Sequence, residues 1–340
     1  MAEDIWTVRR ILAWIEDYLA KRGIGNPRLS AQWLVAEALG TSRMSLFMDL
    51  ERPLTADERA VLRDYTRRRG TGEPLQYITG SVDFRHITLK VEPGVLIPRP
   101  ETEVLVSEVL SLLPPASKPQ DALEAALFKQ YLQLKAETEE ASEEFEAADV
   151  ESLDGPSNLL VADLCTGSGC IACSIAVEHP GTHVIATDIS PEAVALAREN
   201  IEALSLSDRV DVLECDLAAG IDEALLGTFD LIVSNPPYVP TDILSGIPKE
   251  VSDFEPELAL DGGADGLDIF RKLLPWCMVA LKPGGSFAFE LHETCLAQAA
   301  EEATEAGFVD VQTKEDLAQR PRILVARKRP SKTGRSGAAR

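Results

Sequence analysis

Strands and helices alternate along the second half of the chain. Short runs of apolar residues predict buried strands, and apolar residues three to four apart predict helices. The expected strands cover 159–164, 184–187, 210–214, 229–234 and 286–291, and the expected helices cover 169–178, 191–204 and 267–281. This alternation favours an α/β fold with a mostly parallel sheet, whose ligands bind beyond the carboxyl ends of the strands. Candidate functional residues are therefore sought in the loops after these strands.

The loop after the first of these strands is rich in glycine and leads directly into a helix. It runs from Asp163 to Gly169 in the order Asp-Leu-Cys-Thr-Gly-Ser-Gly. Glycine lets a ligand approach the backbone closely, and the first turn of a helix offers unpaired N–H groups. Gly167, Gly169 and Ala172, followed by Asp188, match the dinucleotide-binding fingerprint. The pattern alone is compatible with NAD, FAD or S-adenosylmethionine, and also with a structural turn.

Three aspartates at successive strand ends help to decide between these cofactors. Asp163 would repel a pyrophosphate but would stabilise the ammonium group of a methionine moiety, which favours S-adenosylmethionine. We expect Asp188 to bind ribose hydroxyls. We expect Asp216 to accept a hydrogen bond from an adenine amino group, with Leu217 packed on the ring. Each aspartate taken singly could instead be a capping residue.

The loop after the fourth expected strand contains Asn235-Pro236-Pro237-Tyr238. Two consecutive prolines fix φ and make this loop rigid. The side-chain carbonyl of Asn235 and the backbone carbonyl of Pro236 are two acceptors that match a planar NH2 group, and Tyr238 can lie against its plane. The loop therefore predicts a substrate with an exocyclic amine or a primary amide. Its chemistry depends on alignment and requires no Ser, Cys or His nucleophile.

Two further regions precede the α/β part. Helical spacing of apolar residues predicts a small helical domain over 1–72, in which five arginines between Arg59 and Arg69 form either a solvated face or a docking surface for an anionic partner. A period of two then predicts a β-hairpin linker over 73–100. The α/β domain follows over 101–327.

The net charge limits the partners that the chain can have. It holds 56 Asp and Glu against 33 Lys and Arg, a formal net charge of −23, so we expect no direct binding of nucleic acid. No apolar run approaches the roughly 20 residues that cross a bilayer, and a cytoplasmic protein without a membrane partner is expected. The six cysteines are expected to be free thiols, and no metal site is expected, because the Cys170–Cys173 pair lacks a second pair of ligands.

Two segments have a composition that does not favour a packed core. Residues 137–154 contain nine acidic residues and no basic one, and we interpret 116–157 as an acidic insertion. Residues 328–340 are rich in Lys, Arg, Gly and Ser and are expected to form a disordered basic tail.

The Asn-Pro-Pro-Tyr sequence resembles the signature of methyltransferases that act on planar nitrogen. Further motifs narrow the resemblance: Pro74-Leu-Gln-Tyr-Ile-Thr-Gly80, Leu96-Ile-Pro-Arg-Pro-Glu-Thr-Glu103, Asp253-Phe-Glu-Pro256, Leu260-Asp-Gly-Gly-Ala-Asp-Gly-Leu267 and Leu281-Lys-Pro-Gly-Gly285. With the helical N-terminal domain, they are similar to the peptide chain release factor glutamine methyltransferases of the PrmC/HemK family. The resemblance extends from about residue 5 to residue 327.

This resemblance implies a fold, an activity and a set of site residues. The fold is that of a class I S-adenosylmethionine-dependent methyltransferase, which is Rossmann-like, with the helical domain serving substrate recognition. The activity is methylation of the glutamine amide in the Gly-Gly-Gln motif of class 1 release factors, which modulates translation termination, by a monomer. The implied cofactor-binding residues are Asp163, Cys165, Thr166, Gly167, Ser168, Gly169, Asp188, Asp216, Leu217 and Asn235. The implied substrate-binding residues are Asn235, Pro236, Pro237, Tyr238, Arg99 and Glu101, of which Asn235, Pro236 and Tyr238 are the catalytic residues.

The sequence departs from the family pattern in three places. Cys165 replaces the usual first glycine of the loop, the acidic insertion is unusually long, and Leu291-His292 follows Glu290 where the family tends to have Ile-Gly. Three other functions stay open. A DNA adenine methyltransferase would need a basic surface, an NAD-dependent oxidoreductase would leave the Asn-Pro-Pro-Tyr loop without a role, and a non-catalytic cofactor-binding module would use the same fold.

Overall fold

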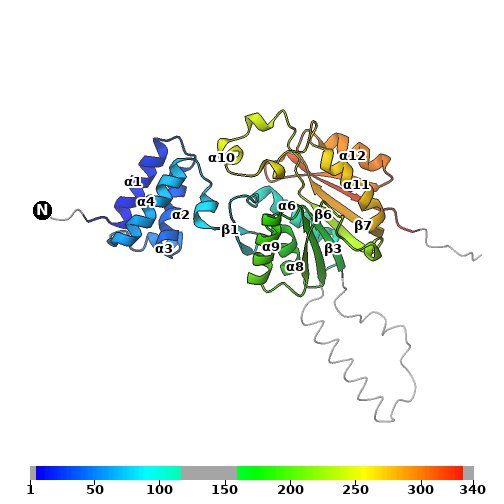
Figure 1. Ribbon diagram of the computed structural model, residues 1–340, viewed down its shortest axis with the longest axis horizontal. Coiled ribbons are helices and arrows are strands. Elements are labelled where there is room, and N and C mark those ends of the chain that lie inside the picture. The colour runs from blue at the N-terminus through cyan, green and yellow to red at the C-terminus, as the bar shows by residue number, and fades with distance from the viewer. Residues whose placement is uncertain (1–4, 116–158, 332–340) are drawn as a thin grey trace, which may run out of the picture.

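The computed structural model describes residues 5–115 and 159–331. The predicted acidic insertion lies outside the described residues, as does most of the predicted basic tail. In Figure 1 a helical bundle lies beside a larger α/β part, and the hairpin and helix α10 lie between them. No helix in these two ranges has the length and apolar character needed to cross a membrane.

The helical bundle packs around its own apolar core. Its helices are α1 (Val8–Ala20), α2 (Pro27–Ala38), α3 (Arg43–Leu46) and α4 (Ala56–Gly70). Helix α4 begins with a capping box, in which Thr55 and Glu58 satisfy each other's backbone N–H groups. Ile15, Leu19 and Leu34 are fully buried between the helices. The predicted helical region is therefore present.

The connection to the α/β part is a short helix followed by a hairpin. Helix α5 (Leu75–Thr79) was not predicted, because the motif around it was interpreted as linker. Strands β1 (Ser81–Phe84) and β2 (Ile87–Lys90) pair antiparallel, as the period of two predicts. At the hairpin turn Arg85 donates two hydrogen bonds of 2.6 and 2.7 Å to the carboxylate of Glu178, so the hairpin is fixed to the α/β part.

A seven-stranded sheet forms the centre of the α/β part, in the order β5-β4-β3-β6-β7-β9-β8. Its strands are β3 (Leu159–Leu164), β4 (Thr182–Asp188), β5 (Val210–Glu214), β6 (Phe229–Ser234), β7 (Leu281–Glu290), β8 (Val309–Glu315) and β9 (Pro321–Arg327). Strands β3 to β7 are parallel, and β9 runs antiparallel to its neighbours β7 and β8. The predicted mostly parallel sheet is confirmed.

Helices cover both faces of the sheet. One face packs against α6 (Pro100–Leu112), α8 (Cys170–Glu178), α9 (Pro191–Ala203) and the hairpin, and the other against α11 (Asp268–Ala280) and α12 (Leu296–Glu305). Strand residues such as Leu231, Ile232 and Val233 are fully buried because helices cover them from both sides. Short helical turns lie at η3 (Glu223–Leu225), η4 (Leu244–Gly246), α10 (Lys249–Ser252) and η5 (Glu257–Ala259).

The predicted elements agree with the structure to within a few residues, but elements at both ends of the α/β part are additional. Helix α6 and the elements α12, β8 and β9 were not predicted. Strand β7 begins at Leu281 rather than Ser286, because Lys282 to Gly285 continue the strand with a shift of register against β6. The domain boundaries at 72 and 100 stay a prediction.

The arginines at the end of α4 do not form a free cationic cluster. Arg67 pairs with Asp64, and Arg68 donates two hydrogen bonds, of 2.9 and 2.5 Å, to the carboxylate of Glu73. Arg69 is buried, with only 5% of its surface exposed. Arg68 and Arg69 form ion pairs with Glu73 and Glu250 of the same molecule, so a docking surface within Arg59–Arg69 could not use these two charges.

Candidate active site

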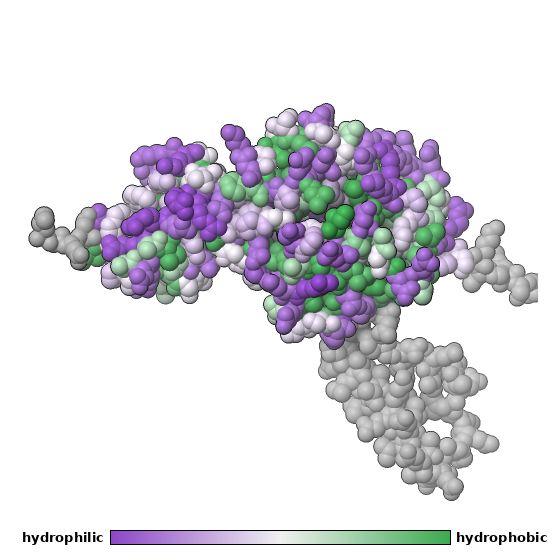
Figure 2. All heavy atoms as spheres, in the orientation of Figure 1, coloured by the Kyte–Doolittle hydropathy of each residue, from purple (hydrophilic) through white to green (hydrophobic). Residues whose placement is uncertain are grey.

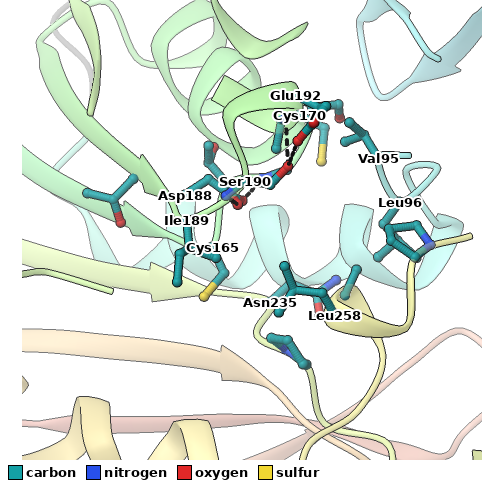
Figure 3. Close-up of a pocket in the computed structure, with 18 of the residues that line it drawn as sticks. Val95, Leu96, Cys165, Cys170, Asp188, Ile189, Ser190, Glu192, Asn235 and Leu258 are labelled. Atoms are coloured by element: carbon teal, nitrogen blue, oxygen red, sulfur yellow. Dashed lines mark hydrogen bonds between the residues drawn. The ribbon is translucent and has the colours of Figure 1, made fainter. Parts of the chain in front are cut away.

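A cavity of about 480 Å³ opens at the carboxyl ends of the parallel strands. Its walls come from residues 94–99, 165–168, 187–190 and 216–217, together with Thr102, Cys170, Ile171, Glu192, Ala193, Asn235, Pro237, Pro256, Leu258, Ala259, Asp261, Ile269 and Lys272. In Figure 3, Cys165 and Asp188 lie on one side of the space, Val95 and Leu96 on another, and Asn235 and Leu258 close it from below. Figure 2 shows hydrophobic residues gathered around the centre of the α/β part, whereas this face of the helical bundle is mostly hydrophilic. The loops singled out in the sequence thus meet around one space.

The glycine-rich loop is held in place by the strand next to it. The N–H of Gly167 donates a 2.8 Å hydrogen bond to Oδ2 of Asp188, and the N–H of Thr166 donates to the carbonyl of Thr187. Cys165, Thr166, Gly167 and Ser168 line the cavity. Gly169 does not line it. A Cβ at Gly169 would lie 3.3 Å from the Cβ of Ala197, so this glycine allows α8 and α9 to pack closely.

Cys165 has a backbone φ of +61°, in the left-handed region that favours glycine. This is the position where the sequence departs from the usual first glycine of the loop. The backbone therefore keeps the conformation of a glycine loop although a side chain is present. Cys165 lines the cavity, and burial raises the pKa of its thiol, so the thiol is neutral.

Asp163 lies behind the cavity rather than in its wall. Its side chain is fully buried, and Oδ2 accepts hydrogen bonds from the hydroxyl of Thr166 at 2.6 Å and from the N–H of Ala172 at 3.1 Å. Oδ1 has no hydrogen-bond partner among the described residues. Burial raises the pKa of Asp163 to about 7, and these hydrogen bonds oppose the rise. Direct contact with a cofactor, as the sequence suggested, is not what this geometry favours, because the loop lies between Asp163 and the cavity.

The charged groups in the cavity wall are mainly acidic. They are the carboxylates of Asp188, Glu192, Asp216 and Asp261, with Arg99 and Lys272 as the cations. The carboxylate of Asp188 also accepts the N–H of Ser190 at 3.0 Å, and burial raises its pKa while these backbone bonds oppose the rise. Such a wall fits a cofactor that carries net positive charge better than it fits a pyrophosphate. Asp216 and Leu217, which were expected to hold an adenine, lie together in this wall.

The Asn-Pro-Pro-Tyr loop is held by the glycine-rich segment 260–266. Val239 donates to the carbonyl of Leu260 at 2.8 Å and accepts from the N–H of Gly262 at 2.9 Å. A Cβ at Gly262 would lie 2.7 Å from Cα of Tyr238, which no side chain tolerates. The Asp-Gly-Gly-Ala-Asp-Gly motif therefore lets two backbone segments approach closely.

Within this loop, Asn235 and Pro237 line the cavity, whereas Pro236 and Tyr238 do not. The side-chain Nδ2 of Asn235 donates a 3.0 Å hydrogen bond to the hydroxyl of Thr102 on α6. Tyr238 donates a 2.9 Å hydrogen bond to Oε1 of the buried Glu290. Burial raises the pKa of Tyr238 well above its usual value, so the phenol stays neutral. An expected role of Tyr238 as a surface for a planar substrate is therefore not favoured by its orientation.

The two remaining predicted site residues make ion pairs. Arg99 lines the cavity and donates from Nη2 to both carboxylate oxygens of Glu255, at 2.7 and 2.6 Å. Glu101 does not line the cavity and accepts a hydrogen bond from Arg320 at 3.1 Å. A direct substrate contact is thus compatible with the position of Arg99 but not with that of Glu101.

Three residues of the site were missed in the sequence. Thr102 and Glu290 join the side chains of Asn235 and Tyr238, and the hydroxyl of Thr102 donates to Oε2 of Glu290 at 2.8 Å. Asn200 of α9 is buried and donates to the carbonyls of Lys90 and Ser168, which connects the hairpin to the glycine-rich loop. Thr102 lies inside a quoted motif, so its hydroxyl could have been noticed, whereas Asn200 carries no signal in one sequence.

No cluster of three or more potential metal ligands occurs among residues 5–115 and 159–331. The six cysteines are free thiols. Burial raises the pKa of the thiols of Cys170 and Cys173, which disfavours the thiolate form that metal binding requires.

Comparison with known proteins gives consistent matches over most of the chain. Residues 10–80 match the family described as PrmC N-terminal domain, and residues 148–243 match the family described as Methyltransferase small domain. A protein of Geobacter sulfurreducens called release factor glutamine methyltransferase is 36% identical over 92% of this chain and 94% of its own length. Proteins with the same name from Caulobacter vibrioides and Koribacter versatilis are 36% and 38% identical over 95% and 89% of this chain, and over 98% and 92% of their own lengths.

Proposed function

Because the chain belongs to the family of release factor glutamine methyltransferases, we propose that the cavity between the glycine-rich loop and Asn235 is its active site. The protein is a protein-glutamine N-methyltransferase that depends on S-adenosylmethionine. Its substrate is a release factor. The target glutamine is that of the Gly-Gly-Gln motif of class 1 release factors, and this finer assignment belongs to the proposal.

The observation that carries the proposal is the position of Asn235. Its side chain shares one cavity with the glycine-rich loop and Asp188, and Nδ2 is already bound to Thr102. Oδ1 is therefore the atom that the Asn235 side chain can offer to a donor in the cavity. A primary amide has two N–H donors, and Oδ1 of Asn235 would hold one of them. The backbone carbonyl of Pro236, which does not line the cavity itself but follows Asn235 directly, is the proposed acceptor for the other.

Orientation is the main contribution that these residues make. An amide nitrogen is a weak nucleophile because its lone pair is delocalised into the carbonyl group. Two fixed acceptors draw electron density towards the nitrogen and aim it in one direction. Alignment of this kind supplies as much as roughly 7–11 kcal/mol of the barrier reduction in well-oriented reactions.

The acidic wall supports the cofactor assignment. S-adenosylmethionine, when bound, supplies a methyl group on a positively charged sulfur. Asp188 would accept hydrogen bonds from its ribose, Asp216 and Leu217 would hold its adenine, and the backbone from Thr166 to Ser168 would contact the rest. Asp163 lies behind the loop and would support it through its hydrogen bonds to Thr166 and Ala172.

Three properties of the protein stay predictions: its cytoplasmic location, its monomeric state, and recognition of the release factor by the helical domain over 1–72. Nucleic acid as a substrate is disfavoured by the net charge of −23.

Incubation with methyl-labelled S-adenosylmethionine tests the proposal. Label should appear in a class 1 release factor and should be absent when the glutamine of its Gly-Gly-Gln motif is replaced by alanine. Duplex DNA should remain unlabelled. Label that persists in the alanine-substituted factor, or that appears in DNA, would contradict the assigned target.

A further inference from the structure

A chain of hydrogen bonds runs from Asn235 into the protein interior. Nδ2 of Asn235 donates to Thr102 at 3.0 Å, the Thr102 hydroxyl donates to Oε2 of Glu290 at 2.8 Å, and Tyr238 donates to Oε1 of Glu290 at 2.9 Å. Thr102 and Glu290 are each only 1% exposed. The four residues come from α6, the end of β7 and the loop after β6. The fold therefore brings distant segments together at one buried carboxyl group.

The direction of each bond in this chain is determined by Glu290. Both oxygens of Glu290 accept, Oε2 from the Thr102 hydroxyl and Oε1 from the Tyr238 hydroxyl, so the single proton of the Thr102 hydroxyl is directed towards Glu290. The Thr102 oxygen can then only accept from the other side, and only the NH2 end of Asn235 can face it. Burial raises the pKa of Glu290, and the hydrogen bonds from Thr102 and Tyr238 oppose that rise.

Because Nδ2 of Asn235 is held by Thr102, the position of the other amide atom, Oδ1, is also fixed. An unconstrained amide can rotate by half a turn and exchange its oxygen and nitrogen. In the rotated form Asn235 would present two donors to the two donors of a substrate amide, and binding for reaction would fail. We propose that Thr102 and Glu290 are positioning residues that keep Oδ1 of Asn235 directed at the substrate glutamine. This inference rests on the proposed role of Asn235.

The same carboxyl group also fixes the far end of the loop. Oε1 of Glu290 binds the hydroxyl of Tyr238 directly, and Oε2 is connected to Asn235 through Thr102, so Glu290 is linked to both ends of the Asn-Pro-Pro-Tyr loop. A buried carboxylate is costly to a fold unless its hydrogen bonds are satisfied. Apolar residues would fill this space at less cost, so a positioning role explains a carboxylate that packing alone does not require.

Paired substitutions at Thr102 test the proposal with the full-length enzyme and a release factor. Thr102→Val removes the hydroxyl but keeps the shape, and we expect kcat to fall on the order of 10- to 100-fold. The Kd for S-adenosylmethionine should change less than about two-fold, and Thr102→Ser should restore most of the activity. Thr182→Val is the matched control, because it removes another buried hydroxyl, which donates to the carbonyl of His179 at the opposite end of the sheet. A Thr102→Val enzyme with normal kcat, or a Thr102→Ser enzyme equally slow, would overturn the proposal.

Glu290→Met extends the test to the carboxyl group. Methionine removes both acceptor oxygens and keeps a similar side-chain volume, so the Thr102 hydroxyl loses the partner that directs its proton. We expect a fall in kcat similar to that of Thr102→Val, and a double variant no slower than about the slower single variant, since both act through Asn235. Losses that multiply would show independent roles and contradict the proposal.

A measurement without turnover separates this inference from the proposed function. The sequence contains four asparagines, so protein labelled with 15N-asparagine gives four side-chain amide signals, and Asn235→Asp identifies one of them. In Thr102→Val that signal should shift and its protons should exchange faster with water, whereas Thr102→Ser should resemble the wild type. An unchanged signal would refute the positioning role. If the wild type methylates no glutamine, the proposed function fails, and the amide signals still decide whether Thr102 orients Asn235.

Discussion

Arg69 of the helical bundle lies against Glu250 of α10, with 3.1 Å between Nη1 and Oε1. Arg69 also donates to the backbone carbonyl of Glu73 at 2.7 Å. Helix α10 belongs to the segment that continues into Pro256 and Leu258 in the cavity wall. The buried guanidinium therefore connects the helical bundle to the segment beside the active site.

Arg69→Met should destabilise the protein through the loss of these contacts. Hydrogen bonds of a charged donor contribute about 1.5–3 kcal/mol each, and we expect the free energy of unfolding to fall by about 2–3 kcal/mol. Glu250→Gln should cost less than about 1 kcal/mol, because its carboxylate is 43% exposed and well screened. Urea denaturation measures both. Arg63→Met, on the exposed surface of the same helix, is the control, and equal losses from Arg63 and Arg69 would show that the ion pair contributes nothing specific.

Asn235→Ala should separate catalysis from cofactor binding. Removal of one preorganised acceptor typically costs about 2.7–4 kcal/mol in the transition state, so we expect kcat to fall by roughly 100- to 1000-fold. The Kd for S-adenosylmethionine, measured by calorimetry, should change far less, because the amide acts on the substrate. Near-normal turnover of this variant would remove Asn235 from the reaction.

The sequence predicted the parallel strands and the loops that follow them, because buried strands and glycine-rich turns are local patterns. It placed Cys165, Gly167, Asp188, Asp216 and Asn235 at strand ends, and all five line one cavity. What it could not predict was side-chain direction. Asp163 and Tyr238 have the expected positions in the chain, yet neither lines the cavity, and each is held by a hydrogen bond to a buried residue.

Contacts between distant segments were the other part that the sequence did not reveal. The arginines of α4 were interpreted as one surface cluster, whereas Arg68 and Arg69 have acidic partners at Glu73 and Glu250. The partner of Arg69 lies 181 residues further along the chain. No periodicity marks such a pair, since ion pairing depends on how two domains pack.

Asp163→Asn should change how stability depends on pH. Burial raises the pKa of Asp163 from its usual 3.8 to about 7, so the folded protein binds this proton more tightly than the unfolded chain. This carboxyl group thus contributes stability that is complete below about pH 4 and is lost as the pH rises to 7. Asparagine does not titrate and keeps an acceptor for Thr166 and Ala172. Between pH 5 and pH 7 the wild type should lose roughly 2–3 kcal/mol relative to the variant. Urea denaturation of both proteins at pH 5 and pH 8 measures this, and parallel losses would show that Asp163 is not the titrating group.

Cys165→Gly should stabilise the glycine-rich loop. A left-handed backbone conformation costs a non-glycine residue about 1–2 kcal/mol of stability, and glycine avoids this cost. Glycine also has more conformational freedom in the unfolded chain, which offsets part of the gain in stability. We expect the free energy of unfolding to rise by up to about 1 kcal/mol. Cys165→Ala keeps the strained φ and should bring no such gain, which makes it the control in thermal denaturation. If alanine stabilised as much as glycine, the thiol rather than the backbone would be the source of the effect.

Gly262→Ala should disturb the Asn-Pro-Pro-Tyr loop from behind. The new Cβ would lie 2.7 Å from Cα of Tyr238 and 2.9 Å from Cα of Gly266, so two backbone segments must separate. Overpacking of this kind costs about 1–3 kcal/mol of stability. Because Tyr238 follows Asn235 by three residues, the displacement reaches the acceptors of the site, and kcat should fall at least about 10-fold. Gly246→Ala is the matched control, since nothing lies within 4 Å of its Cβ position. It should preserve both stability and turnover. A Gly262→Ala enzyme that is destabilised but fully active would show that the Asp-Gly-Gly-Ala-Asp-Gly motif supports the fold without positioning Asn235.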